Sequence, residues 1–199
     1  MSLLLLIVAG YLVGSLSFAV IVSRAMRLPD PHSYGSGNPG ATNVLRTGNK
    51  VAAVLTLLGD ALKGYVVVAV ACAVFDRFGF TDANLALAGL AAFLGHLYPL
   101  YFGFRGGKGV ATAAGVLFGI SGWLGLAVLG VWLSTFAVLR VSSISALAAA
   151  LASPVLAGLF GGNRNVVGIV LVMALLLVWR HRENIRRLRA GTEKQVGTK

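Results

Sequence analysis

VATAAGVLFGISGWLGLAVLGVWLSTFAVL, residues 110–139, is a stretch of thirty residues without a charged side chain. A helix needs about 20 mostly apolar residues to cross the hydrocarbon core of a bilayer. The stretch is therefore too long for one span and short for two. Whether it forms one helix or two decides on which side of a membrane everything after Leu139 lies.

The rest of the chain is also apolar. Of its 199 residues 57% are hydrophobic and only 12% are charged, whereas a soluble domain has about 25% charged residues. So few polar side chains cannot cover the surface of a water-soluble protein. We therefore expect an all-α integral membrane protein, a single polytopic domain over residues 1–199. Its other candidate spans are Leu3–Ser23, Val51–Phe75, Asn84–Phe102, Ile144–Phe160 and Val166–Trp179.

The basic residues decide between the two readings, because Lys and Arg of short loops concentrate on the cytoplasmic side. The first loop carries Arg24, Arg27, Arg46 and Lys50, which places it in the cytoplasm and the amino terminus outside. If residues 110–139 form two short helices that turn near Ser121–Gly122, the basic tail of residues 180–199 is cytoplasmic as well. Fourteen of the seventeen basic residues then lie inside.

One long helix over residues 110–139 would instead place the basic tail outside. The sequence therefore predicts seven transmembrane helices, with the amino terminus outside and the carboxyl terminus in the cytoplasm. The formal net charge of +11 is explained by this orientation and by anionic head groups, so it does not indicate nucleic acid. The single cysteine, Cys72, excludes an intrachain disulfide.

Three polar segments interrupt the apolar pattern, and the predicted topology places all of them on the cytoplasmic face. They are Ser36–Arg46 (SGNPGATNVLR), Gly95–Gly109 (GHLYPLYFGFRGGKG) and His181–Gly191 (HRENIRRLRAG). A fourth, shorter turn on the same side carries Ser142 and Ser143. Because they share one face, these segments are the candidates for chemistry.

The first segment has an unusual density of hydrogen-bonding side chains. Five of them fall within eleven residues, interleaved with glycine and proline: Ser36, Asn38, Thr42, Asn43 and Arg46. A bare connection between two helices does not need so many. The alternative, a capped loop at the membrane surface, stays open at this stage.

The second segment ends in Arg105-Gly-Gly-Lys-Gly109, directly before an apolar helix. Exposed backbone N–H groups at the start of a helix bind phosphate, and glycines let the backbone approach the anion. Lys108 and Arg105 would add charge-assisted contacts. The spacing is not that of a Walker loop, and a flexible basic turn is an equally good interpretation of so short a run.

Two further pairs have a helical spacing. His181 and Asn184 are three residues apart and can share one face of a helix, while Glu183 can pair with Arg186 or Arg187. Asp60 and Lys63, inside a predicted span, are also three apart, and we interpret them as a structural ion pair rather than a catalytic one.

Several chemistries do not fit these residues. Three scattered histidines without a carboxylate cluster do not fit a metal site, and a Ser-His-Asp triad lacks an acid on the cytoplasmic side. What remains is a set of cations, amides and hydroxyls suited to phosphate compounds. An anion transporter is the main alternative, but transport favours charged residues deep in several spans, and a lipid-binding scaffold would not explain Ser36–Arg46.

In their order and spacing the three segments resemble the three motifs of the acyl-phosphate:glycerol-3-phosphate acyltransferase family. The resemblance covers essentially the whole chain. Arg105 stands where the family commonly has lysine, and the loop after Arg46 is shorter than the common form. The resemblance implies transfer of an acyl group from acyl phosphate to the sn-1 hydroxyl of glycerol 3-phosphate, without metal, cofactor or thioester donor.

The residue chemistry and the resemblance together predict the site. Ser36, Lys108 and His181 are the candidate catalytic residues. The base is either His181 or a substrate phosphate, and Ser36 as a covalent acyl carrier is disfavoured because no base is evident beside it. The candidate substrate-binding residues are Asn38, Thr42, Asn43, Arg46, Arg105, Gly106, Gly107, Gly109, Ser142, Ser143 and Asn184.

The resemblance also sets expectations for location and partners. It implies a multi-pass protein of the bacterial cytoplasmic (inner) membrane, with its active site on the cytoplasmic face. The expected partners are acyl phosphate, glycerol 3-phosphate and membrane lipid, but not nucleic acid. The soluble enzyme that makes acyl phosphate is a candidate protein partner.

Overall fold

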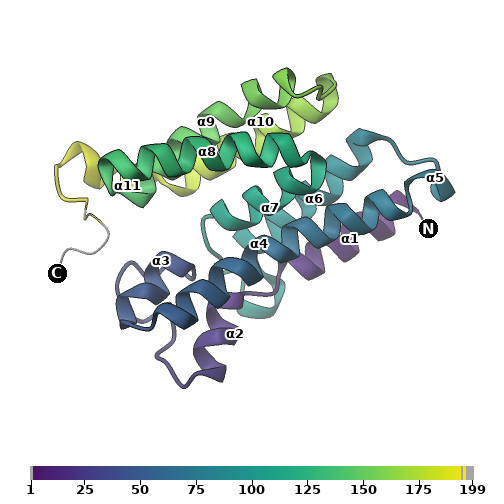
Figure 1. Ribbon diagram of the computed structural model, residues 1–199. Coiled ribbons are helices and arrows are strands. Elements are labelled where there is room, and N and C mark those ends of the chain that lie inside the picture. The colour runs from purple at the N-terminus through teal and green to yellow at the C-terminus, as the bar shows by residue number, and fades with distance from the viewer. Residues whose placement is uncertain (1, 194, 196–199) are drawn as a thin grey trace.

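The computed structural model in Figure 1 describes residues 2–193 and 195, and all regular structure in these residues is helical. Lys194, Thr198 and Lys199 of the predicted basic tail lie outside the described residues. The all-α prediction is therefore confirmed for the part of the chain that is described. Its longer helices are α1 (Leu3–Gly14), α2 (Phe18–Ala25), α4 (Lys50–Ala73), α6 (Asp82–Leu97), α7 (Val110–Ile120), α8 (Gly122–Leu139), α9 (Ser142–Leu159), α10 (Arg164–Arg180) and α11 (Arg182–Arg189).

The stretch of residues 110–139 forms two helices, as predicted. The break is at Ser121, whose backbone is extended at φ −157° and whose Oγ accepts a hydrogen bond from the N–H of Leu124. Serine is a favourable residue at this position because its side chain satisfies an N–H group at the start of the second helix. Helices α7 and α8 then pack against each other.

The first predicted span, Leu3–Ser23, is broken into α1 and α2, which are bent by 41°. The break falls at Ser15, Leu16 and Ser17. Helix α1 packs closely on α6 because a Cβ atom at Gly14 would overlap the backbone of Ala92, and one at Gly95 would overlap the backbone of Tyr11. Small residues at helix contacts of this kind let backbones approach closely in a bilayer.

The helices form two groups that meet where α6 packs on α10 and where α7 packs on α8. Helices α1, α4 and α7 pack together and against α6, while α8, α9 and α10 form the second group, of which α10 also contacts α6 (Figure 1). Phe93 and Leu97 of α6 are completely buried in this contact region. The short elements α3 (Ala41–Val44), η1 (Leu45–Thr47), α5 (Phe75–Phe78) and η2 (Leu100–Phe102) lie in the connections.

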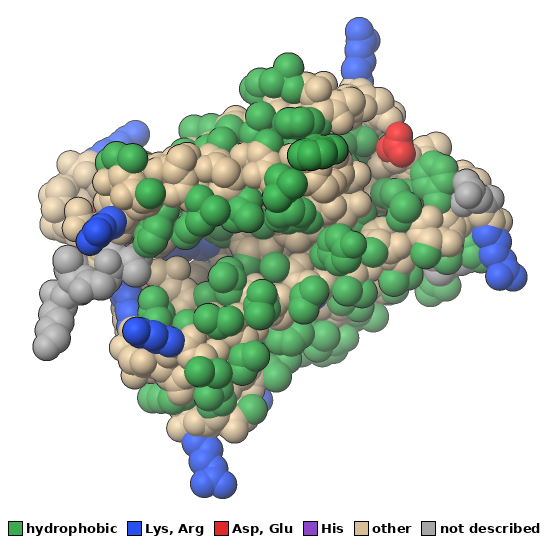
Figure 2. All heavy atoms as spheres, in the orientation of Figure 1, with side chains coloured by type: hydrophobic (Ala, Val, Ile, Leu, Met, Phe, Trp, Pro, Cys, Tyr) green, Lys and Arg blue, Asp and Glu red, His purple; other side chains and the backbone are tan. Residues whose placement is uncertain are grey.

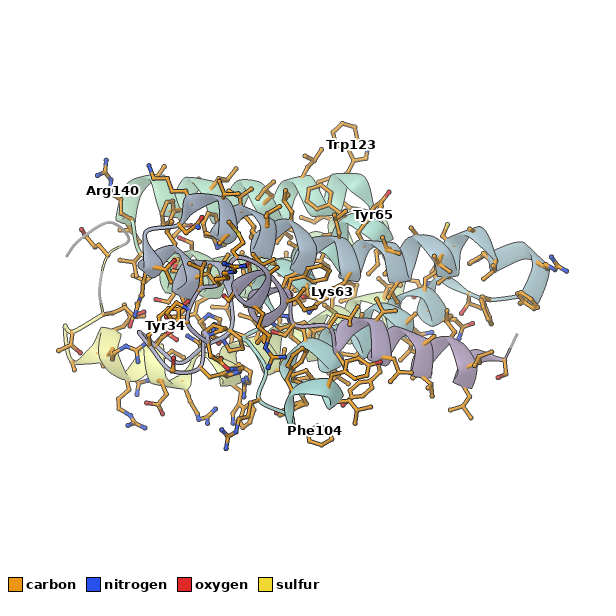
Figure 3. All side chains as sticks on the ribbon, turned by 90° about the horizontal axis from the view of Figure 1, so that it is seen from below. Tyr34, Lys63, Tyr65, Phe104, Trp123 and Arg140 are labelled. Atoms are coloured by element: carbon orange, nitrogen blue, oxygen red, sulfur yellow. The ribbon has the colours of Figure 1, made fainter. Side chains whose placement is uncertain are left out.

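The outer surface is apolar, as a bilayer requires. Hydrophobic side chains cover the long helices on the face shown in Figure 2, and Lys and Arg side chains lie toward the ends. Trp123 and Val138 of α8 are 72% and 80% exposed. Figure 3 shows the contrast between Trp123, which points away from the protein, and Lys63, which lies between the helices. Apolar residues exposed to this degree need lipid around them.

The number of spans depends on how the shorter helices are counted. Four helical segments are long and apolar enough by themselves, and the bent pairs α1/α2 and α10/α11 bring the count to as many as six. Helix α7 has 11 residues, which is about 16 Å at 1.5 Å per residue, against a hydrocarbon core of about 30 Å. The seven-span count includes α7 as a short span, and both this count and the orientation stay predictions.

Cysteine labelling checks the topology. In a Cys72→Ala background, a cysteine at position 140 should react with a membrane-impermeant maleimide only after the membrane is opened. A cysteine at position 164 should react in intact spheroplasts. Labelling of position 140 from outside would contradict the seven-span arrangement, because it would put the α8–α9 turn on the wrong side.

Candidate active site

The polar segments meet at one end of the bundle, where several helices begin or end. The end of α6 leads into the glycine-rich loop, α7 and α9 begin there, and α10 gives way to α11 (Figure 1). Toward this end the surface in Figure 2 is hollowed between α8 and α4. Segments that are far apart in the chain therefore lie at the same end of the helix bundle.

Asn43 organises the first segment. It is 2% exposed; its Oδ1 accepts from the N–H (3.0 Å) and the Oγ (3.2 Å) of Ser36, and its Nδ2 donates to the carbonyls of Pro31 (2.8 Å) and Tyr34 (3.2 Å). An amide side chain has no further capacity after four such bonds. The sequence predicts that Asn43 binds substrate. In the structure its amide is instead fully used in hydrogen bonds that hold the loop in shape.

Other residues of the first segment remain available. Ser36, Thr42 and Arg46 are exposed, and Asn38 is half-buried. The Arg46 side chain runs beside Gly35, where a Cβ atom would lie 3.0 Å from its Cδ and overlap Asn43. Gly35 also has φ +60°, a backbone conformation that favours glycine. Because Gly35 has no side chain, the Arg46 side chain can lie directly against the backbone of the loop.

The glycines of the second segment are packed against the protein. A Cβ atom at Gly106 would overlap the carbonyl of His96, and one at Gly107 would overlap the His96 ring. The N–H of Gly107 donates to the carbonyl of His96 at 3.2 Å, so this donor is not free for a phosphate. Gly109 has φ +85° and precedes α7, which confirms that the loop opens a helix.

Arg180, at the end of α10, binds the backbone carbonyls of the glycine-rich loop. Its Nε donates to the carbonyl of Gly107 (3.1 Å), and its other bonds reach the carbonyls of Gly106 (2.7 Å) and Gly107 (2.9 Å). The guanidinium also lies 5.7 Å from the centre of the Tyr98 ring. In the sequence Arg180 is one of several basic residues of the tail, and the one signal of its role is its position directly before His181.

A buried polar cluster lies behind the same loop. Lys63 Nζ is 2.8 Å from Asp60 Oδ1, which confirms the predicted ion pair, and it also donates to the carbonyl of Leu16 at 2.6 Å. His96 Nδ1 lies 3.5 Å from the same Asp60 oxygen. Leu16 sits in the break between α1 and α2, so Lys63 satisfies a carbonyl that the interrupted helix leaves free.

His181 lies just beyond the last apolar helix and is 3% exposed. Its Nδ1 is 2.8 Å from the carbonyl of Leu177. A carbonyl only accepts, so Nδ1 carries the hydrogen, and Nε2 of the neutral ring is an acceptor. Burial lowers the pKa of His181 to about 4, although the hydrogen bond to Leu177 acts in the opposite direction. The ring is therefore neutral at pH 7.

Lys108 links the second segment to the third. Its Nζ donates to Oδ1 of Asn184, which is buried on the same helix end as His181. Burial, together with the nearby charge of Arg187, lowers the pKa of Lys108 to about 8, while Glu193 opposes the shift. A lysine in this state is charged at pH 7 and loses its proton in mildly alkaline solution.

The start of α9 joins the same site. Ser143 donates from Oγ to the Glu193 carboxylate at 2.7 Å, and Asn184 and Arg187 donate to that carboxylate as well. Ser142 is half-buried at the first position of α9. Glu183 pairs with Arg186 at 3.0 Å on the exposed side of α11, as predicted. Glu193 itself was missed by sequence reasoning, because a lone acid in a basic tail carries no pattern.

Arg105 contacts the rest of this region through its backbone carbonyl. His32 Nε2 lies 2.9 Å from the Arg105 carbonyl, while His32 Nδ1 lies 2.7 Å from Asp30 Oδ1. These contacts join the loop before Ser36 to the glycine-rich loop, and the Arg105 side chain itself is exposed. The second segment is thus hydrogen-bonded both to the loop that precedes Ser36 and, through Lys108, to the third segment.

Known proteins of one family are similar to this chain in sequence. The profile of the family described as "Glycerol-3-phosphate acyltransferase" matches residues 4–191. A glycerol-3-phosphate acyltransferase of Thiobacillus denitrificans is 60% identical over 194 residues, which are 98% of this chain and 97% of that relative. One of Ralstonia nicotianae is 56% identical over 192 residues, 96% of this chain and 93% of the relative.

Solved structures are similar over the whole chain. The crystal structure of PlsY (YgiH), an integral membrane glycerol 3-phosphate acyltransferase, in its glycerol 3-phosphate form has a TM-score of 0.92 and 39% sequence identity, and the match covers 100% of this chain and 97% of that one. The lysophosphatidic acid form gives a TM-score of 0.89 with the same identity and coverage.

Replacing Arg180 should loosen the glycine-rich loop. Hydrogen bonds to a charged group are worth about 1.5–3 kcal/mol each, so Arg180→Ala should speed amide hydrogen exchange at residues 106–109 by at least tenfold. Arg182→Ala is the matched control, because Arg182 is exposed and covers the Trp179 ring at 4.7 Å instead of contacting the loop. Equal exchange in both variants would show that Arg180 does not hold the loop.

The lowered pKa of Lys108 predicts a pH dependence of anion binding. The ammonium form binds phosphate, and it is lost as the pH rises through about 8. The dissociation constant for inorganic phosphate, measured by calorimetry between pH 6 and 10, should therefore increase on the alkaline side. In Lys108→Met binding should be weak throughout and this alkaline change should disappear. A wild-type constant that stays level up to pH 10 would contradict the assignment.

Proposed function

The chain belongs to the glycerol-3-phosphate acyltransferase family, and we propose that it transfers a fatty acyl group from acyl phosphate to the sn-1 hydroxyl of glycerol 3-phosphate. The products would be 1-acyl-glycerol 3-phosphate and inorganic phosphate. The family assignment makes it a membrane acyltransferase of phospholipid synthesis that acts on glycerol 3-phosphate. The donor and the acylated position are the parts that we propose.

One observation carries the proposal: Lys108 and Asn184, 76 residues apart in the chain, are hydrogen-bonded to each other between the glycine-rich loop and α11. Arg46 and Arg187 are close enough to depress the pKa of Lys108. Positive charges gathered in one place attract an anionic substrate. Both proposed substrates carry phosphate, and so does one product.

The reaction suits this set of residues because acyl phosphate is already activated. The sn-1 oxygen attacks the carbonyl carbon, the bond from that carbon to the phosphate oxygen breaks, and phosphate leaves with the electron pair. The protein then has to orient the two substrates and stabilise charge on the departing phosphate. Lys108 and the arginines would supply this stabilisation without a metal or a cofactor.

The proton of the sn-1 hydroxyl needs an acceptor, and two candidates were left open by the sequence. His181 offers a neutral Nε2, but burial lowers the pKa of the ring to about 4, which makes it a weak base. A phosphate has a second pKa of about 6 and is present on both substrates. We therefore assign the proton to a substrate phosphate and give His181 the role of orienting the hydroxyl.

Ser36 is assigned to binding rather than to covalent catalysis. Its Oγ lies 3.2 Å from Asn43 Oδ1, and an amide cannot take the serine proton as a general base. Because the Asn43 oxygen accepts, the hydroxyl of Ser36 donates to it and presents its lone pairs outward. Thr42 and Asn38 of the same loop would contact the substrates as hydrogen-bonding groups.

The buried ion pair argues against the transport alternative. Asp60 and Lys63 are charged residues inside a span, but they bind each other and the carbonyl of Leu16. Their charges are thus accounted for by the helix break. We propose a bacterial inner-membrane location, an active site on the cytoplasmic face, and delivery of acyl phosphate by the soluble enzyme that makes it.

A donor assay tests the proposal. Purified protein with acyl phosphate and glycerol 3-phosphate should form lysophosphatidate, with the acyl group at sn-1 and with activity that survives EDTA. Acyl-CoA with the same chain should give no comparable turnover, since the site is built for a phosphate leaving group. Equal rates with both donors would refute the assignment of acyl phosphate.

Substitution of His181 tests the proton acceptor. If a substrate phosphate is the base, His181→Gln should retain much of the activity, and the acid limb of kcat should persist near the phosphate pKa of about 6. If His181 were the base, His181→Ala and His181→Gln would both lower kcat by about 10²–10⁴-fold and abolish that limb. The profile of kcat against pH for the wild type and both variants separates these outcomes.

A further inference from the structure

Glu193 lies beyond α11, where the chain turns back on that helix. Gly191 adopts φ +67°, and the N–H of Thr192 donates to the carbonyl of Arg187 at 2.9 Å. This turn brings the Glu193 side chain to the face of α11 that carries Asn184. The side chain is only 10% exposed, although it belongs to the end of the chain.

Three donors converge on the Glu193 carboxylate. Its Oε1 accepts from Ser143 Oγ at 2.7 Å and from Asn184 Nδ2, and its Oε2 accepts from Arg187 Nε at 2.6 Å. Ser143 comes from α9 and the other two from α11. Partial burial raises the pKa of Glu193, but these hydrogen bonds outweigh that effect and the pKa lies below its ordinary value. The group is therefore a carboxylate at pH 7.

We propose that Glu193 is a positioning residue of the acyl-transfer site, holding Ser143, Asn184 and Arg187 in the arrangement that receives a substrate phosphate. The inference rests on the proposed function. Glu193 acts on the substrate through its neighbours, since its own negative charge would repel a phosphate.

Glu193 fixes the orientation of the Asn184 amide. Its Oδ1 accepts from Lys108, and its Nδ2 donates to Glu193. An ammonium group can only donate and a carboxylate can only accept, so the two partners together fix which way the amide points. Without Glu193 the amide can rotate, and Lys108 loses a fixed partner at the helix end.

Charge balance gives Glu193 a second effect on Lys108. Arg187 on α11, Arg180 at the end of α10 and Arg46 in η1 all disfavour the protonated lysine, and Glu193 favours it. His181 on the same helix end is neutral and adds no charge at pH 7. Removing the carboxylate charge should therefore make Lys108 lose its proton at lower pH.

Matched variants separate the two effects. Glu193→Gln keeps the size of the side chain but removes the charge, so the KM for glycerol 3-phosphate should rise about ten- to a hundredfold, the equivalent of one charge-assisted hydrogen bond. The alkaline limb of kcat/KM should move to lower pH. Glu193→Asp keeps the charge but cannot reach all three donors, so KM should rise while the limb stays near its wild-type position.

Glu183→Gln is the control, because Glu183 forms only the exposed pair with Arg186 and should leave both KM and the pH profile unchanged. Thermal unfolding in detergent checks that each variant is folded; if Glu193→Gln is not, Glu193→Asp still tests the reach of the side chain. A folded Glu193→Gln protein with wild-type KM and alkaline limb would overturn the proposal. A lowered KM would also overturn it, by showing that the carboxylate competes with substrate phosphate.

Failure of this inference is distinguishable from failure of the proposed function. If the wild-type protein turns over no acyl phosphate, the proposed function fails. The same variants are then compared by their dissociation constants for inorganic phosphate. Weaker phosphate binding in Glu193→Gln than in Glu183→Gln supports the positioning role, and equal binding rejects it.

Discussion

The structure depends on one constraint: a backbone polar group at membrane depth must find its partner inside the protein. Helix α1 stops before it could complete a span, and the carbonyl of Leu16 in the break is bound by Lys63. Lys63 is charged, so it needs Asp60, and His96 closes the cluster from α6. A single interruption of one helix thus brings three buried ionisable side chains together.

That cluster also supports the site, because His96 is the residue on which the glycine-rich loop rests. Gly106 and Gly107 pack directly against it, and the N–H of Gly107 is bonded to its carbonyl. From the other side Arg180 binds the carbonyls of both glycines. The loop is therefore clamped, and the close approach that needs glycine is to the protein itself. Lys108 and the start of α7 follow directly along the chain.

The cations of the site are pre-arranged by neutral and anionic side chains. Asn184 joins Lys108 to Glu193, and Glu193 in turn holds Ser143 and Arg187. In the proposed reaction such an arrangement would cost little reorganisation as negative charge develops on the departing phosphate, which is the general advantage of fixed dipoles and charges in catalysis. The neutral His181 is consistent with this arrangement, because a protonated imidazole near the Lys108 ammonium would add repulsion.

The sequence by itself determined the all-helical membrane fold, the break near Ser121 and the three polar segments, since apolar length, capping residues and local clusters are properties of neighbouring residues. It also identified the Asp60–Lys63 pair from its helical spacing. Only the tertiary structure decided that Asn43 shapes its loop, that Arg180 and His96 enclose Gly106 and Gly107, and that Glu193 accepts hydrogen bonds from α9 and α11. These roles arise from contacts between residues far apart in the chain or beyond a turn, and no local pattern records which distant backbone a side chain will reach.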